Sequence, residues 1–222
     1  FLNRAVFKVT VRQVYFTAVQ AMPIVPVTAL ALGSIPVHFL LNLLTNLGAY
    51  DEIGGYLTWL MLDEIAPFTC ALIITLRSVP AVISEMALMS INREFDTLRM
   101  LGVREHHYIY LPRIIAFIIA GPCMALIFSV IGLIGSYFVL GYVHDITFNS
   151  YLDHIIYGIR FSNLLVLLIK PAIMSAGICL ISIGRGIQAD KTITEVPILL
   201  IKGMTESFAF LGIVEVVFIL LS

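Results

Sequence analysis

The stretch NREFDTLRMLGVREHHYIYLPR, residues 92–113, decides the fold because it is rich in charge while the sequence on both sides is apolar. Residues 65–84 before it contain a single formal charge, Arg77, and residues 114–143 after it contain none. A helix of about 20 apolar residues is long enough to cross the hydrocarbon core of a bilayer. The pattern therefore predicts two membrane spans joined by a charged loop at the membrane surface.

The composition extends this interpretation to the whole chain. Of the 222 residues, 60% are hydrophobic and 12% are charged, whereas soluble domains carry about 25% charged residues. So few charged side chains cannot cover a globule of this size, and we expect an integral membrane protein. The net charge of −1 provides no strongly basic surface, so nucleic acid is not expected as a partner.

The apolar segments predict an all-α, polytopic membrane protein with about five transmembrane helices in a single domain, residues 1–222. The spans are expected at residues 22–44, 65–84, 114–143, 161–184 and from about 204 to the end. Lys and Arg gather before the first span, between the second and third, and between the fourth and fifth, which places these segments in the cytoplasm. The N-terminus is therefore expected in the cytoplasm and Ser222 on the outer side.

Residues 1–20 are expected to form an interfacial helix. Arg4, Lys8 and Arg12 recur every four residues and so share one helical face, while apolar residues occupy the others. A basic amphipathic helix of this kind lies at the level of the lipid headgroups. The alternative is an ordinary anchor beside the first span.

Residues 90–104, inside the charged stretch, are expected to form a second short amphipathic helix. Ile91, Phe95 and Leu98 make one apolar stripe, extended by Leu101, and Gly102 is placed to end the helix. Asp96 and Arg99 can pair across one turn. The pattern leaves two interpretations open: the helix lies on the bilayer, or another protein docks on it.

The run RSVPAVISEMALMSINREFDTLRMLGV, residues 77–103, followed by Leu111-Pro112-Arg113, resembles the signature of the MlaE/YrbE permease family. These permeases are the membrane subunits of ABC transporters that work with MCE-domain proteins. The resemblance rests on four residues that follow one another in steps of four and on residues 95–103 after them. It also includes Glu64-Ile65-Ala66-Pro67 upstream and NLLVLLIK at residues 163–170 downstream. The four stepped residues are Arg77, Ala81, Glu85 and Met89.

The resemblance implies a transport subunit rather than an enzyme. It would move phospholipid or a similar hydrophobic substrate between a bacterial inner membrane and an MCE-type periplasmic carrier. The implied partners are a second copy of the chain and a cytoplasmic ABC ATPase dimer, which would bind ATP and Mg²⁺. Residues 90–104 would then be the coupling helix. Its expected ATPase contacts are Glu94, Asp96, Leu98 and Arg99.

Charges within the spans are costly and are usually paired or face a cavity. Arg77 and Glu85 share one helical face but lie too far apart to pair, so we expect structural contacts from each to neighbouring spans. For Glu64 and Lys170 two interpretations stay open: an interfacial acid with a lysine snorkelling to the outer headgroups, or a lipid-headgroup site in an outward-opening cavity. Glu215 is a weaker candidate for the substrate site.

No cofactor site is expected in this chain. The text nearest to a nucleotide-binding P-loop, GRGIQADKT at residues 184–192, has Asp190 where that loop requires glycine, and is expected to be a plain loop. His106 and His107 are adjacent, so their side chains point in different directions on a helix. We expect a solvated loop there and no metal site.

Three other functions remain as alternatives. A proton-coupled secondary transporter would use Glu64, Glu85 and Glu215 as proton sites, although the inverted repeats typical of that class are not evident. A membrane-embedded lipid-modifying enzyme would act through Asp63, Glu64 and a histidine. A structural anchor would need neither Glu64 nor Lys170.

Overall fold

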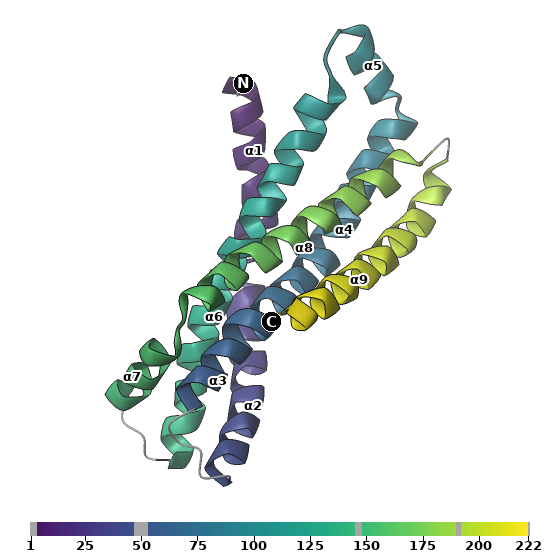
Figure 1. Ribbon diagram of the computed structural model, residues 1–222. Helices are drawn as coiled ribbons and strands as arrows, with labels where there is room; N and C mark the ends of the chain where they lie inside the picture. Colours follow the sequence, from purple (N-terminus) through teal and green to yellow (C-terminus); the bar gives the residue numbers. More distant parts are fainter. Residues whose placement is uncertain (1–3, 47–52, 145–147, 190–191, 222) are drawn as a thin grey trace. The chain divides into compact units, whose positions relative to one another are not determined.

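The computed structural model describes residues 4–46, 53–144, 148–189 and 192–221. Every regular element in these residues is helical and none is a strand, which confirms the predicted all-α class. The elements, labelled in Figure 1, are α1 (Arg4–Thr17), η1 (Val19–Ala21), α2 (Ile24–Asn46), α3 (Ile53–Trp59), η3 (Leu60–Ile65), α4 (Ala66–Ile91), α5 (Glu94–Met100), η4 (His106–Tyr110), α6 (Leu111–His144), α7 (Phe148–Gly158), α8 (Phe161–Ile187), η5 (Ile193–Glu195) and α9 (Val196–Leu221).

The predicted spans correspond to long apolar helices. Within the described residues, 4 helices are long and apolar enough to cross a membrane: Gly54–Ile91, His106–Phe138, Phe161–Ile187 and Val196–Leu220. A fifth span is present if residues 7–21 and 24–40, which are separated by a short break, count as one. This agrees with the predicted number of about five.

Two predicted boundaries are wrong. The second span was expected to begin at residue 65, but the helix already runs through η3, and the fifth was expected at about residue 204, but α9 begins at Val196. Both errors arose where charged residues suggested a helix end. Glu64, before the first of these boundaries, pairs with Lys170, so the helix includes it. Lys202, before the second, is an exposed residue of α9, and the helix continues through it.

Two expected loops are also helical. Residues 184–187 of the GRGIQADKT segment belong to the end of α8, and residues 106–110 form the π-helix η4. A helix can continue past the apolar residues of a span, and polar composition alone does not reveal this.

The chain divides into two compact units. Unit 1 comprises residues 1–21, 71–121 and 172–222, and unit 2 comprises residues 22–70 and 122–171. The divisions fall inside α4, α6 and α8. That residues 1–222 act as one permease domain stays a prediction.

Unit 2 is organised by the packing of α7 on α3. Tyr151 and Ile155 of α7 are buried, and the Thr58 hydroxyl of α3 donates a hydrogen bond to the carbonyl of Gly158 over 3.0 Å. Gly54 faces α7 so closely that a Cβ there would overlap the carbonyl of His154. The sequence reasoning missed α7, although its buried residues lie four apart as on one helical face.

Unit 1 contains α5 and the turns that bound it. Arg93 adopts a left-handed conformation (φ 56°) immediately before α5, and Gly102 does so after it (φ 72°). The Gly102 amide donates to the carbonyl of Arg99 and the Val103 amide to that of Leu98, each over 3.0 Å. This is the Schellman arrangement that a C-terminal glycine permits, as predicted. The helix is shorter than the expected 90–104 because α4 continues to Ile91 before it and the turn at Gly102 follows it.

Candidate functional site

Lys170 of α8 is the most deeply buried cation of unit 2 among the described residues, with 0% of its surface exposed. Its ammonium donates to Oε2 of Glu64 over 2.9 Å and to the main-chain carbonyl of Asp63 over 2.7 Å. The Glu64 side chain is 17% exposed, so it is the more accessible member of the pair. The interpretation of Lys170 as a snorkelling lysine is wrong, because its ammonium turns inward to η3.

The local sequence explains why a carbonyl is available to Lys170. In an α-helix the carbonyl of Asp63 would accept a hydrogen bond from the amide of residue 67, but that residue is Pro67, which has no N–H. The backbone changes to a π-helix over Leu60–Ile65, a feature frequent at functional sites. The Lys170 ammonium therefore contacts two acceptors. One is the Asp63 carbonyl, which lacks the donor that it would have in an α-helix, and the other is the carboxylate of the next residue, Glu64.

This arrangement concentrates three ionisable groups in unit 2, because Asp63 is itself 8% exposed and lies next to Glu64. Charges removed from water need partners, and the partners of the lysine include the Glu64 carboxylate and the Asp63 carbonyl. If Glu64 moves aside, the ammonium becomes a ready partner for an anionic oxygen. Phosphate is such a group, whereas a neutral apolar substrate would gain nothing from it.

Glu215, the third predicted substrate-site residue, lies half-buried in α9. It belongs to unit 1, so the structure describes it separately from Glu64 and Lys170. Its role stays a prediction.

Glu85 and Arg77 contact different partners, as their spacing requires. The Glu85 carboxylate pairs with Nη2 of Arg113, which is 1% exposed at the start of α6. Arg77 donates from Nη2 to Oε1 of Gln20 in η1 over 3.0 Å. The sequence reasoning missed Arg113, which it counted as a loop cation; its position directly before an uncharged apolar segment was the available signal.

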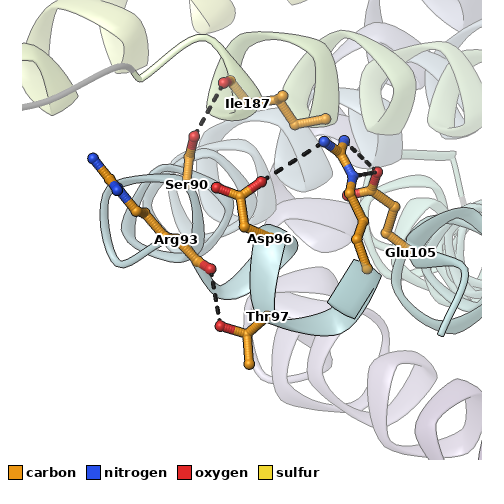
Figure 2. A network of polar contacts seen from close by, with 7 residues as sticks. Ser90, Arg93, Asp96, Thr97, Glu105 and Ile187 are labelled. Atoms are coloured by element: carbon orange, nitrogen blue, oxygen red, sulfur yellow. Dashed lines mark hydrogen bonds and ion pairs between the residues drawn. The ribbon is translucent and has the colours of Figure 1, made fainter. Parts of the chain in front are cut away.

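Figure 2 shows the polar contacts around α5. Arg99 donates from Nε and Nη2 to Oε1 of Glu105, over 2.9 and 2.6 Å, and lies 3.8 Å from Asp96. The Glu105 carboxylate raises the pKa of the Arg99 guanidinium. The predicted Asp96–Arg99 pair is thus present, but Arg99 is held mainly by Glu105. Glu105 was missed, since a carboxylate in a polar stretch gives no sign that it is buried.

The remaining α5 residues differ in exposure. Glu94 and Asp96 are exposed and Leu98 is half-buried, whereas Phe95 is buried. Leu101, expected to extend the apolar stripe, is 72% exposed, and Met100 is 88% exposed. Leu101 lies beyond the last helical turn, so the helical period no longer determines where it points. Met100 and Leu101 form an exposed apolar tip of the loop, which we call the α5 tip.

Among the described residues, no group of three or more His, Cys, Asp or Glu side chains is placed to hold a metal ion, and this applies to His106 and His107 as well.

Comparison with known proteins identifies the family. The family model Permease MlaE matches residues 10–221. A probable ABC transporter permease protein of Rickettsia felis is 25% identical over 181 residues, covering 82% of this chain and 70% of that protein. Protein TRIGALACTOSYLDIACYLGLYCEROL 1, chloroplastic, of Arabidopsis thaliana is 29% identical over 143 residues, 64% of this chain and 41% of that protein.

A third relative carries a more specific name. The intermembrane phospholipid transport system permease protein MlaE of Haemophilus influenzae is 26% identical over 129 residues, covering 58% of this chain and 49% of that protein. With its long apolar helices and a family match over nearly its whole length, this chain belongs to the MlaE permease family.

Proposed function

We propose that this chain is the permease subunit of an ABC transporter that moves phospholipid, or a similar hydrophobic molecule with an anionic head, through a bacterial inner membrane. The observation that carries the proposal is the fully buried ammonium of Lys170 beside Glu64 in a membrane-spanning helix. The relatives named as ABC transporter and phospholipid transport permeases support it.

In this proposal Lys170 and Glu64 form the headgroup site. A phosphate oxygen replaces the Glu64 carboxylate on the ammonium, and the carbonyl of Asp63 keeps the lysine in place. A charge-assisted hydrogen bond to phosphate is roughly twice as strong as a neutral one. Its strength allows a buried lysine to hold a lipid by its head while the acyl chains stay in an apolar environment. Glu215 remains the weaker candidate in α9.

The energy comes from a partner. This chain has no P-loop, so ATP and Mg²⁺ bind to a separate cytoplasmic ATPase dimer. The ATPase docks on α5, which acts as the coupling helix through Glu94, Asp96, Leu98 and Arg99 and through the α5 tip. Exposed apolar residues rimmed by charge are typical of a protein-binding surface, and the Arg99–Glu105 contact keeps the loop in one shape before docking.

The permease works as a homodimer, with its N-terminus in the cytoplasm and its C-terminus in the periplasm. An MCE-domain protein on the periplasmic side receives or delivers the lipid. The distribution of Lys and Arg along the chain supports the orientation.

The test is purification of the permease from its native membrane, with identification of bound proteins and lipids by mass spectrometry. We expect an ABC ATPase, an MCE-type protein and phospholipid. Leu101→Asp should release the ATPase and retain the MCE-type protein, whereas His107→Asp, an equally polar change in the same loop, should retain both. A chain that is recovered without an ATPase in all three forms would contradict the proposal and favour a proton-coupled transporter or a membrane enzyme.

A further inference from the structure

A pocket of about 450 Å³ lies in unit 1 beside α5. Its walls come from α1, α4, α5, η4 and α6, and its apolar lining includes Met89, Leu98 and Ile109. Small-molecule sites usually measure about 300–1,000 Å³ and combine apolar walls with a few polar groups. The pocket has this size and composition, and the headgroup site proposed above does not include it, because Glu64 and Lys170 belong to unit 2.

The charged groups of the pocket favour a cationic ligand. Two carboxylates, Glu85 and Glu94, and one guanidinium, Arg113, line it. The guanidinium already pairs with Glu85, while Glu94 is exposed and receives a long 3.4 Å contact from the Asn92 amide. The pocket therefore has an excess of negative charge. Tyr108 also lines it, and an aromatic ring adds a second favourable surface for an ammonium group.

The same pocket contains donors that lack acceptors. Arg113 is 1% exposed, and its Nε and Nη1 have no hydrogen-bond partner within the described residues. A buried guanidinium with unused N–H groups is unfavourable unless an oxygen reaches it. A ligand that combines an ammonium with an anionic oxygen would satisfy both the carboxylates and the arginine.

The position of α1 indicates where such a ligand comes from. Val9 and Gln13 of α1 line the pocket, and Lys8 and Arg12 beside them are exposed. A basic amphipathic helix lies among the headgroups of a leaflet. Under the orientation of the proposed function, on which this step rests, that leaflet is the cytoplasmic one.

We infer that the pocket between α1, α4, α5 and α6 binds a cytoplasmic-leaflet phospholipid with a primary ammonium head, such as an ethanolamine phospholipid. Its ammonium lies between Glu85 and Glu94, a phosphate oxygen lies against Arg113, and the beginning of its acyl chains lies along Leu98 and Met89. Because one molecule then contacts α4, α5 and α6, the lipid also holds the coupling helix in position.

The test uses the permease assembly in phosphatidylcholine nanodiscs that contain a small fraction of phosphatidylethanolamine with a diazirine near its glycerol. After illumination, labelled peptides are mapped by mass spectrometry. We expect labelling in residues 85–98, prevented by unlabelled phosphatidylethanolamine but not by phosphatidylglycerol. Glu94→Gln, which removes a charge-assisted contact, and Leu98→Trp, which fills the pocket, should each lower it at least about threefold. Asp153→Asn, at an exposed acid of α7 that lies outside both the pocket and the α5 docking surface, should not.

Equal competition by phosphatidylglycerol, or undiminished labelling in Leu98→Trp, would overturn the inference. Protection of these peptides from lipid labelling wherever a partner protein is bound would also overturn it and identify the pocket as a protein-docking site. The readout requires neither ATP hydrolysis nor lipid transfer, so a failure of the proposed transport function would leave this result unchanged.

Discussion

The ion pairs Lys170–Glu64 and Arg99–Asp96 lie in two regions of the molecule and differ in distance and in exposure to solvent. Lys170 and Glu64 are 2.9 Å apart with 0% and 17% of their side chains exposed, whereas Arg99 and Asp96 are 3.8 Å apart with 65% and 57% exposed. Water screens the second pair, which therefore contributes little. The first pair is largely removed from water, so each member depends on the other. Removal of a charge should accordingly matter far more in η3 and α8 than on the surface of α5.

The largest effect is expected for Lys170→Met. It leaves Glu64 without its cation in a buried site, which costs about 3–5 kcal/mol of stability. The melting temperature of the purified protein in detergent should fall clearly. Lys202→Met, at an exposed lysine of α9, is the control and should melt with the wild type. If Lys170→Met and Lys202→Met had the same melting temperature, Lys170 would behave as a surface charge, and the predicted difference between the two ion pairs would be wrong.

The next effect concerns packing in unit 2 without any charge. Gly54→Ala places a Cβ on the main chain of His154, and such overpacking costs about 1–3 kcal/mol. Gly55→Ala, the neighbouring residue with nothing within 4 Å of its Cβ position, should leave the melting temperature unchanged or raise it slightly. Equal effects of the two substitutions would contradict the close contact of α3 with α7.

A smaller effect is expected at the end of α5. Gly102 has φ 72°, and alanine in the left-handed region costs about 1 kcal/mol. Gly102→Ala should speed hydrogen exchange in residues 94–105 while the rest of the chain exchanges as before. Gly184→Ala, a helical glycine with free space around it, serves as the control. Unchanged exchange in Gly102→Ala would mean that the turn does not depend on this conformation.

The smallest effect is expected for Asp96→Asn. Its contact with Arg99 is long and exposed, so thermal stability and loop exchange should match the wild type within error. Glu105→Gln weakens the shorter contact to a buried carboxylate, and it should loosen the loop measurably. A larger effect of Asp96→Asn than of Glu105→Gln would reverse the roles assigned to the two acids.

Much of the fold could be predicted from the sequence because the membrane imposes a strong pattern. Long apolar runs, the charged stretch and Gly102 each follow from local rules, and the structure contains the expected helices and turn. The exact helix ends could not be predicted where a charge inside a span is neutralised from another helix. Glu64 was predicted as a boundary because its partner, Lys170, lies more than a hundred residues later in the sequence.

The candidate site was only partly predictable for the same reason. The family resemblance selected Glu64 and Lys170, and Pro67 was an available sign that the carbonyl of Asp63 needs another donor. The apolar segment after Arg113 was a sign that this residue is buried, but no local pattern showed that it pairs with Glu85 or that Glu105 holds Arg99. Each of these contacts depends on which helices pack together, and the periodicity of one segment carries no information about that.

The most direct test of the account is the double variant Glu64→Gln with Lys170→Met, assayed for ATP-driven lipid transfer and for melting temperature. Removing both charges relieves the unpaired carboxylate of Lys170→Met, so much of the lost stability should return. The account predicts that lipid transfer nevertheless stays absent, because no ammonium remains for the phosphate. Recovery of transfer together with stability would contradict it and would show that the buried pair only supports the fold.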